Sequence, residues 1–445
     1  MSKIKNNKIA VVGCGPSGIF TCYFLNKLGY TNIHLYGDIN DAQPKTIMVD
    51  DIVNDIATCY IHNGYNNSIV KLLNEFNLQC YDIGGENYIQ RIINNKITEI
   101  DNVNISLDEL HNLILFIYLC IKWKLFNTTS HEYSKNMEDY LKNNGVNTSS
   151  KLIKFITMYG TNAQGYGYIN DVTSYHLFRW LRISILFTNK LGINSKRMIT
   201  GGFSNLFRTI FNNLQLKRKI NKNVIECDKN FLTYDKKTKY YDNIFICCPL
   251  VNLKTPLHKK INNIKHITYS KFFSFTFETT LKIKELRHRL YIDDNILKNK
   301  KSKILTIRYN NKTPYGVNSN CGRHIYVCVG YCETFNENKE KTIIQKELKK
   351  YGFDIKKDIY FQIYKYNYRF TTNAIQEGLH LYVNKQQGND GLYYLGGMLS
   401  HWDVDSIYEH SREIVNNFHL NNTNNIIDKI QTFVNIQYNK WIDEW

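Results

Sequence analysis

The chain has 445 residues, of which 43% are hydrophobic and 14% aromatic, and this composition excludes disordered and fibrous proteins. The length predicts two or three packed domains rather than one simple core. Lys and Arg number 57 against 39 Asp and Glu, so the net charge is +18; we favour a solvated basic surface and keep a nucleic-acid-binding site as the alternative.

The N-terminus has the pattern of a β-α-β unit. Apolar residues 9–12 predict a buried strand, the glycine-rich residues 13–18 a tight turn, residues 19–28 a helix and residues 33–36 a second strand. Helical spacing of apolar residues then recurs at positions 69–76, 107–126, 149–159 and 173–187.

The middle of the chain changes to short strands. Gly201 and Gly202 interrupt the chain, and Ser204 is expected to cap a helix that ends near Leu214. Strands are expected at 223–227, 231–234 and 243–247, followed by strands of a larger sheet at 266–277, 303–309 and 323–330. Lysine clusters at 217–222, 236–239 and 298–303 have the composition of turns.

The last part predicts a helix at 341–351, a strand at 360–364 and a closing unit. That unit is a buried strand at 392–395, a pair of glycines, and a helix over about 405–418. The tail at 426–441 is amphipathic, and its role stays open between packing at home and docking a partner.

The first turn carries the spacing G-x-G-x-x-G, formed by Gly13, Gly15 and Gly18 with Pro16 and Ser17 between them. The first glycine permits a tight turn, the second lets a diphosphate approach the backbone, and the third lets helix and strand pack closely. Unpaired N–H groups at the helix start would meet the phosphates. The strand–turn–helix context therefore predicts a dinucleotide site, with a purely structural glycine turn as the alternative.

The acid that usually binds the ribose at the end of the second strand is displaced by one residue. Tyr36 and Gly37 occupy the expected place, and Asp38 follows them. Asp38 either reaches the ribose hydroxyls or caps a turn.

Four stretches together resemble the flavin-containing amine oxidase superfamily, whose fold monoamine and polyamine oxidases share. They are residues 11–36, residues 55–78, residues 199–206 with 223–225 and 241–246, and residues 386–407. The resemblance implies one dissociable FAD, because no cysteine stands in the context used for covalent attachment. It also implies adenine contact through the backbone of Val224.

The same resemblance implies an α/β fold: a Rossmann-type FAD-binding domain with a second domain of mixed sheet and helices for the substrate. The FAD domain would be assembled from residues 1–62, 195–262 and 380–445, and the substrate domain from residues 63–194 and 263–379. One departure is the second glycine pair of the family, which is replaced by residues 40–44.

The closing unit suits the flavin ring. Glycines after a buried strand would let Gly397 and Met398 approach a flat ring, and a helix starting at Val404 and Asp405 would direct its positive end at the pyrimidine edge. A turn into an ordinary surface helix is the alternative.

Catalytic candidates are less specific. Tyr366 lies where related sequences carry an aromatic segment, Tyr394 flanks the flavin strand, and Lys271 is the candidate for the family lysine near flavin N5. Packing explains either tyrosine equally well. His401 is a further candidate acid–base group, with a polar turn as the commoner explanation.

Metal and other nucleotide chemistry find no support in the sequence. The Glu285–His288 pair stands alone between charged residues, and no second G-x-G-x-x-G follows. We expect no metal and a simple circuit, from a small amine-like substrate to flavin N5 and then to dioxygen or another acceptor. The alternatives are a desaturase, isomerase or mutase on the same fold, and a non-catalytic basic module.

The expected compartment follows from three features. Eleven cysteines lack a disulfide framework, which favours a reducing environment. The longest apolar run, residues 113–121, is too short to cross a bilayer, and a first strand beginning at Lys8 leaves no room for a signal peptide. We therefore expect a soluble, cytoplasmic protein.

Overall fold

The computed structural model describes residues 6–41, 44–56, 58–62, 67–82, 88–93, 96–101, 106–125, 130–161, 164–180, 196–261, 263–280, 282, 289–292, 302–423 and 429–434.

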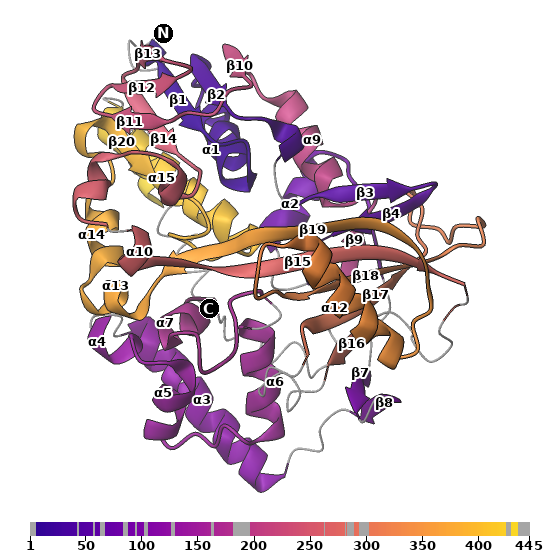
Figure 1. The fold of residues 1–445 in the computed structure, drawn as a ribbon. Helices are drawn as coiled ribbons and strands as arrows, with labels where there is room; N and C mark the ends of the chain where they lie inside the picture. Colours follow the sequence, from indigo (N-terminus) through magenta and orange to yellow (C-terminus); the bar gives the residue numbers. More distant parts are fainter. Residues whose placement is uncertain are drawn as a thin grey trace.

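Within these ranges, five strands form one parallel sheet in the order β10-β2-β1-β14-β20. Their bounds are β1 (Ile9–Val12), β2 (Ile33–Tyr36), β10 (Arg218–Ile220), β14 (Asn243–Ile246) and β20 (Leu392–Tyr394). The register places Ile9 beside Ile33 and Asn243, and Ile244 beside Leu392. The sheet thus joins three widely separated parts of the chain in the upper lobe of Figure 1.

The parallel sheet separates two apolar cores. Ile9 and Val11 of β1 contribute to one core and Ala10 and Val12 to the other, because successive side chains of a strand face opposite sides. Helices pack on the first side: α1 (Pro16–Lys27), α2 (Asn67–Glu75), α9 (Phe203–Asn213) and α15 (Val404–Asn422). An antiparallel meander contributes to the other side: β11 (Glu226–Asp228), β12 (Phe231–Tyr234) and β13 (Lys237–Tyr240).

A second sheet crosses the middle of the molecule (Figure 1). Its described strands follow the order β19-β15-β18-β17-β16-β7-β8, and all neighbours are antiparallel except β16 and β7. The bounds are β7 (Tyr88–Ile93), β8 (Lys96–Asp101), β15 (Ile267–Thr279), β16 (Arg289–Ile292), β17 (Ile304–Asn310), β18 (His324–Tyr331) and β19 (Ile355–Phe370). Helix α12 (Glu337–Lys350) packs against this sheet, and the two enclose a separate core rich in aromatic side chains.

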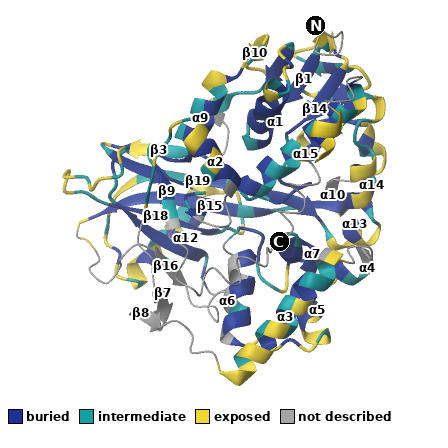
Figure 2. Ribbon diagram, turned by 180° about the vertical axis from the view of Figure 1, so that it is seen from behind, coloured by how far each residue is buried: buried dark blue, intermediate teal, exposed yellow. Residues whose placement is uncertain are grey.

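A group of helices lies below the second sheet in Figure 1. They are α3 (Leu107–Leu125), α4 (Ser130–Tyr133), α5 (Met137–Asn143), α6 (Lys151–Gly160) and α7 (Ser174–Trp180). Figure 2 shows that α3 is buried toward the other helices and exposed on its outer face.

The remaining elements are short. They comprise β3 (Thr46–Val49) with β4 (Ile52–Asp55), the sheet of β5 (Ile61–His62), β9 (Lys196–Ile199) and β6 (Cys80–Asp82), and the helices α10 (Asn263–His266), α13 (Thr372–Gln376) and α14 (Leu379–Lys385). Single 3₁₀ turns lie at Ile39–Asp41, Leu250–Asn252, Pro256–Lys259 and Asn389–Gly391.

The α/β prediction is confirmed: a parallel sheet with helices is joined to a mixed sheet with helices. The strands predicted at 9–12 and 33–36 have those bounds. The helix predicted at 173–187 is described only over Ser174–Trp180. Residues 285–288 and most of the tail at 426–441 lie outside the described residues.

Ser204 does not cap α9, so that prediction is wrong. Gly202 occupies the N-cap position with φ 81°, and Ser204 lies inside the first turn. The helix start is instead held by the Asp55 carboxylate, which accepts from the Phe203 N–H at 3.0 Å. The Ser204 Oγ accepts from the Thr46 N–H at 2.8 Å.

The prediction of turns for two lysine clusters is also wrong. Residues 217–222 contain β10, and residues 236–239 contain most of β13. Both strands lie at a described edge of their sheets, where charged side chains stay in solvent. The strand predicted at 223–227 begins only at Glu226, and the strand at 360–364 is the middle of the much longer β19.

Candidate functional site

A cavity of about 400 Å³ lies at the carboxyl ends of four parallel strands. Its lining residues follow β1 (13–17), β2 (37–38), β14 (247–250) and β20 (395–398). Residues 364–368 of β19 close the opposite side. In open α/β sheets ligands bind in the crevice outside the carboxyl ends of the strands, so the cavity occupies the position expected of a binding site.

The three glycines of the first turn do three different things. Gly13 has φ +114°, a conformation that side chains rarely adopt. A Cβ on Gly18 would lie 1.7 Å from the Gly13 carbonyl oxygen, so this glycine permits the contact between turn and helix. A Cβ on Gly15 would meet nothing within 4 Å, because this residue borders the cavity.

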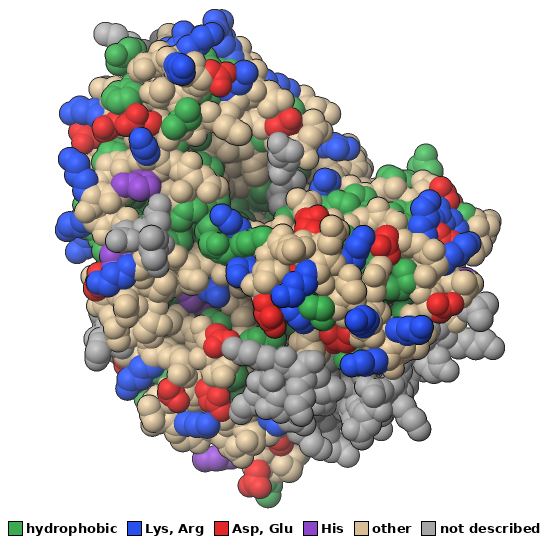
Figure 3. All heavy atoms as spheres, in the orientation of Figure 1, with side chains coloured by type: hydrophobic (Ala, Val, Ile, Leu, Met, Phe, Trp, Pro, Cys, Tyr) green, Lys and Arg blue, Asp and Glu red, His purple; other side chains and the backbone are tan. Residues whose placement is uncertain are grey.

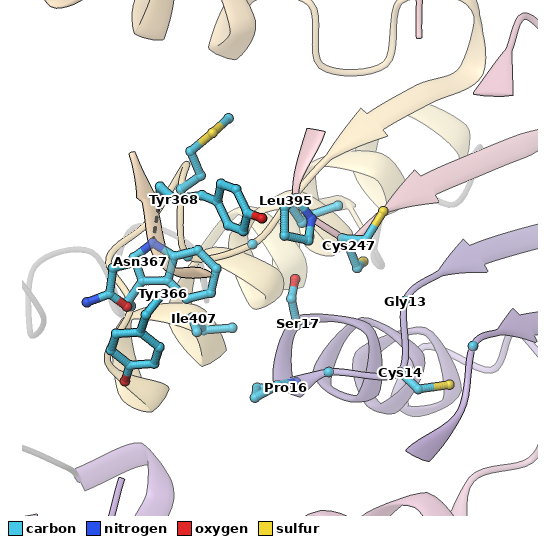
Figure 4. Close-up of a pocket in the computed structure, with 18 of the residues that line it drawn as sticks. Gly13, Cys14, Pro16, Ser17, Cys247, Tyr366, Asn367, Tyr368, Leu395 and Ile407 are labelled. Carbon is cyan, nitrogen blue, oxygen red and sulfur yellow. Dashed lines mark hydrogen bonds between the residues drawn. The ribbon is translucent and has the colours of Figure 1, made fainter. Parts of the chain in front are cut away.

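Helix α1 begins beside this open space. Gly15 is its N-cap and Pro16 its first residue, so the missing N–H of proline costs no helical hydrogen bond. Ser17 is 4% exposed, and its Oγ has no hydrogen-bond partner among the described residues. Figure 4 shows the Ser17 hydroxyl pointing away from α1 toward the space bordered by Cys247, Leu395 and the β19 tyrosines. Buried hydroxyls are normally paired, so this one fits an acceptor supplied by a ligand.

Asp38 lines the cavity and also caps a turn. Its Oδ1 accepts from the Asn40 N–H at 2.8 Å, and its Oδ2 accepts from the Asn221 amide at 2.9 Å. The Asn40 backbone hydrogen bond, followed by that of Asn221, holds the pKa of the carboxyl below its usual range. Asp38 is therefore an anionic acceptor fixed at the edge of the site.

Gly397 leaves room for the Trp402 ring at the other end of the cavity. A Cβ here would lie 2.3 Å from the Trp402 indole, which itself lines the cavity. The Trp402 Nε1–H donates to the Tyr368 carbonyl oxygen at 2.7 Å, drawn as a dashed line in Figure 4. The backbone turns at the preceding residue, Gly396, whose φ is +114°. Gly397 also lines the cavity beside Trp402, so its predicted contact with a flavin ring stays a prediction.

Helix α15 begins at Val404, which lines the cavity. Its N-cap is Asp403, whose Oδ1 accepts from the Ser406 N–H at 2.9 Å and whose Oδ2 lies 2.9 Å from His401 Nδ1. Asp405 does not reach the cavity: it is 1% exposed and accepts from the Ile69 N–H at 3.4 Å. The helix start therefore faces the site with an anionic cap that offsets part of its positive end.

Tyr366 reaches the cavity from β19. Its ring stacks on Phe272 with centroids 5.0 Å apart, and burial raises the pKa of its phenol to about 12. The next residue, Asn367, has φ +51° and donates to the Gln164 carbonyl oxygen. The neutral Tyr366 side chain is thus part of the cavity wall, and the strand is irregular at the next residue.

Besides Asp405, four expected site residues lie away from the cavity lining. Tyr394 is 2% exposed in the core, and its backbone is held by the Gln387 side chain at 2.8 and 2.7 Å. Val224 packs on that same core beside Asn223, which does line the cavity. Gly18 lies under the turn.

The fourth, Lys271, is directed elsewhere. Its Nζ donates to the Glu333 carbonyl oxygen at 2.5 Å and lies 5.5 Å from the centre of the Phe335 ring. We therefore do not assign a role at the cavity to Tyr394 or Lys271. His401 is 1% exposed beneath Tyr166, with ring centroids 4.8 Å apart, and it too is absent from the lining.

Sequence reasoning missed three cysteines at the cavity, Cys14, Cys247 and Cys248. Burial raises the pKa of Cys14 and Cys248 to about 12 and that of Cys247 to about 11. Their thiols are therefore neutral and form an apolar part of the cavity wall. Their positions directly after β1 and β14 were the signal that could have found them.

Among the residues that the structure describes, no group of His, Cys, Asp or Glu side chains has the arrangement of a metal site. No described helix is both long and apolar enough to cross a bilayer.

Solved structures with the same fold cover nearly the whole chain. A fatty acid isomerase from P. acnes has a TM-score of 0.74 at 13% identity, over 94% of this chain and 99% of that one. Putrescine oxidase bound to putrescine has a TM-score of 0.69 at 11% identity, over 93% and 99%. Cyclohexylamine oxidase from Brevibacterium oxydans IH-35A has a TM-score of 0.63 at 9% identity, over 93% and 100%.

No protein-family model matches the sequence, and no curated protein matches it. At these identities the similarity establishes the fold.

Proposed function

We propose that this chain, which has the fold of the flavin-containing amine oxidase superfamily, is a FAD-dependent oxidoreductase acting on a small, amine-like molecule. One observation carries the proposal: the glycine turn after β1 and the glycine pair after β20 border one cavity, although Gly15 and Gly396 stand 381 positions apart in the sequence. On this proposal, the diphosphate and the flavin ring of one FAD would occupy the two ends of this cavity.

The lining residues suit the parts of FAD in chain order. The N-terminal turn of α1 offers backbone N–H groups and the Ser17 hydroxyl to a diphosphate. Asp38 would bind the ribose hydroxyls and Val224 the adenine; Asp38 and Asn223, the neighbour of Val224, both line the cavity. Leu395 to Met398, with Val404, would border the ring. When bound, FAD supplies the hydride-accepting chemistry.

The chain itself contributes shape and electrostatics. Tyr366, Tyr368 and Trp402 form an aromatic wall that would orient a substrate against the ring and exclude water. The N-terminus of α15 directs the positive end of its dipole toward Val404, and the anionic cap Asp403 offsets part of this effect. The described cavity lining contains no histidine, but it includes Lys365 and three tyrosines of β19.

A second reaction class stays open, because the similar structures include a fatty acid isomerase as well as amine oxidases. On this alternative the chain removes hydride from a C–C bond and returns it, without net oxidation.

The test starts with the visible spectrum of the purified chain. We expect the FAD to be dissociable, because no cysteine stands in the sequence context that the superfamily uses for covalent attachment. Acid precipitation should then release the flavin spectrum into solution. Anaerobic incubation with a panel of primary and secondary amines should bleach the flavin band. A yellow protein that no amine reduces would contradict the oxidation of amines.

Peroxide release on readmission of air separates the two classes. An oxidase produces peroxide as it turns over, whereas an isomerase converts its substrate without consuming oxygen.

A further inference from the structure

Charge is unevenly distributed along the cavity lining. Among the described lining residues, the charged side chains are those of Asp38 and Lys365. Asp38 follows β2 and accepts hydrogen bonds from Asn40 and Asn221. Lys365 belongs to β19, which closes the opposite side of the cavity. The described lining on the β19 side therefore carries one cation and no carboxylate.

The Lys365 side chain lies beside two aromatic rings. Its Nζ is 5.4 Å from the centre of the Tyr269 ring and 5.9 Å from the centre of the Phe335 ring. The Tyr269 ring lies 5.3 Å from the ring of Tyr368, which also lines the cavity. Lys365 is exposed, and Phe335 is 43% exposed. Lys365 thus combines a solvated charge with an apolar surface that continues to the cavity.

A second cation stands directly opposite Lys365. Lys271 of β15 is its cross-strand partner, and the Lys271 Nζ lies 5.5 Å from the centre of the same Phe335 ring. Like charges directly opposite each other destabilise a sheet. The Lys271 Nζ donates to the neutral Glu333 carbonyl oxygen, whereas the Glu333 carboxylate lies 3.5 Å from the Lys303 Nζ. An anion beside Lys365 would reduce the repulsion between the two opposed lysines.

The diphosphate of the proposed cofactor has a different position in the cavity. Gly15 and Ser17, at the start of α1, line the side away from β19, and helix starts bind phosphate groups. The anion expected at Lys365 is therefore a separate group. A carboxylate on an apolar carbon chain suits both the ammonium and the neighbouring rings, because the chain can pack on Phe335 and Tyr269.

We propose that Lys365 binds a carboxylate group of the substrate at the β19 side of the cavity, so that the substrate is an amine bearing an acid group rather than a plain amine or a diamine. This inference rests on the proposed function, because it takes the bound flavin as the other wall of the substrate site. Lys271 contributes through its charge alone, since it is absent from the described lining.

The test measures binding by isothermal titration calorimetry on the full-length chain, first as purified and then saturated with added FAD. Hexanoate, hexanamide and hexylamine differ only in the head group, and inorganic phosphate serves as the other anion. The wild-type chain should bind hexanoate at least about threefold more tightly than the other hexyl compounds, which is the range of an exposed ion pair. Equal binding of the three, or tighter binding of phosphate, overturns the proposal.

Variants of Lys365 locate the effect. Lys365→Gln should abolish the preference for hexanoate, and Lys365→Glu should reverse it in favour of hexylamine. Lys357→Gln, which removes an exposed cation of the same strand, is the matched control and should leave the preference unchanged. A folded Lys365→Gln chain that keeps the wild-type preference overturns the proposal. If that chain does not fold, Lys365→Arg decides: it keeps the charge, so loss of the preference in a folded Lys365→Arg chain contradicts the proposal.

A variant of the opposed lysine separates the two cations. Lys271→Gln should reduce the preference for hexanoate by less than Lys365→Gln does, because the charge of Lys271 acts from farther away and is screened by salt. A larger loss with Lys271→Gln would assign the carboxylate to Lys271 and overturn the proposal.

The measurements with saturating FAD distinguish a substrate site from a site for the cofactor's phosphates. The preference for hexanoate should persist in the FAD-saturated chain. Loss of the preference on saturation would mean that Lys365 faces the cofactor, and it overturns the proposal. A chain that takes up no FAD but prefers hexanoate, and loses this preference with Lys365→Gln, would support the carboxylate site and refute only the flavin function.

Discussion

Gly15 and Gly18 belong to one motif but are constrained from opposite directions. Gly15 has ordinary extended backbone with φ −70° and open space where a side chain would be. Gly18 has no room, because its Cβ would overlap the Gly13 carbonyl. The motif therefore combines one residue kept small for a ligand with one kept small for the fold.

Gly15→Val should leave stability nearly unchanged and weaken FAD binding by about 10- to 100-fold, since steric overlap in a packed site costs about 1–3 kcal/mol. Gly18→Ala should instead destabilise the fold by about 1–3 kcal/mol. Urea denaturation and FAD titration of both variants check this. The reverse pattern would mean that the turn is only structural.

Asp55 makes stability depend on pH. The residue is fully buried, and burial raises its pKa from 3.8 to about 6 against the hydrogen bonds from Thr46 and Phe203. A raised pKa means that the folded state holds the proton more tightly than the unfolded state, so stability falls as pH rises from about 4 to about 6. The loss is about 3 kcal/mol.

Asp55→Asn removes this titration while keeping an oxygen that can accept from the Phe203 N–H. Urea denaturation at several pH values should show a flatter profile between pH 4 and about 6 than the wild-type chain shows. A variant profile parallel to the wild type would contradict the assignment to Asp55.

At the scale of single elements, periodicity located most helices and strands but not their irregularities. The apolar runs of β1 and β2 were sufficient because these strands are buried on both faces. β10 and β13 were missed because edge strands carry lysines that resemble turns. Ser204 was assigned to a cap that Asp55 fills from 148 residues away, and such a long-range contact leaves no local signal.

The sequence also predicted only those residues of the candidate site that a local motif carries. Gly13, Gly15, Pro16, Ser17 and Asp38 were found because a local motif carries them, and each lines the cavity. The register shift next to Tyr366 depends on the pairing of β19 with β15, and no sequence pattern within β19 reveals it. Lys271 was misplaced because its strand was predicted correctly but the direction of its side chain was not.

The cap of α15 gives a prediction at this scale. Asp403→Ala removes the acceptor of the Ser406 N–H and should cost about 1 kcal/mol of stability. Asp403→Asn keeps an acceptor and should cost less. Urea denaturation compares the two; equal losses would show that the charge beside His401, and not the cap, matters.

On the face of the molecule drawn in Figure 3, the basic charge is spread rather than gathered. Figure 3 shows Lys and Arg side chains interspersed with Asp and Glu over the visible face. Several of the described exposed lysines are paired, such as Lys222 with Asp235 and Lys229 with Asp390, each at 2.9 Å. This distribution supports the solvated surface over a nucleic-acid site, which needs cations gathered on one face.

The assembly of the parallel sheet from three distant parts of the chain has a thermodynamic consequence. A ligand that binds the folded chain at the ends of β1, β2, β14 and β20 holds these parts together, so it stabilises the whole fold by mass action. The domain division at residues 62, 195, 262 and 380 stays a prediction.

The most direct measurement is a titration of the flavin-free chain with FAD, followed by urea denaturation with and without the cofactor. The account predicts one FAD per chain and about 2.7 kcal/mol of added stability at a free FAD concentration a hundred times the Kd. A folded chain that takes up no FAD and gains no stability from it would contradict the account.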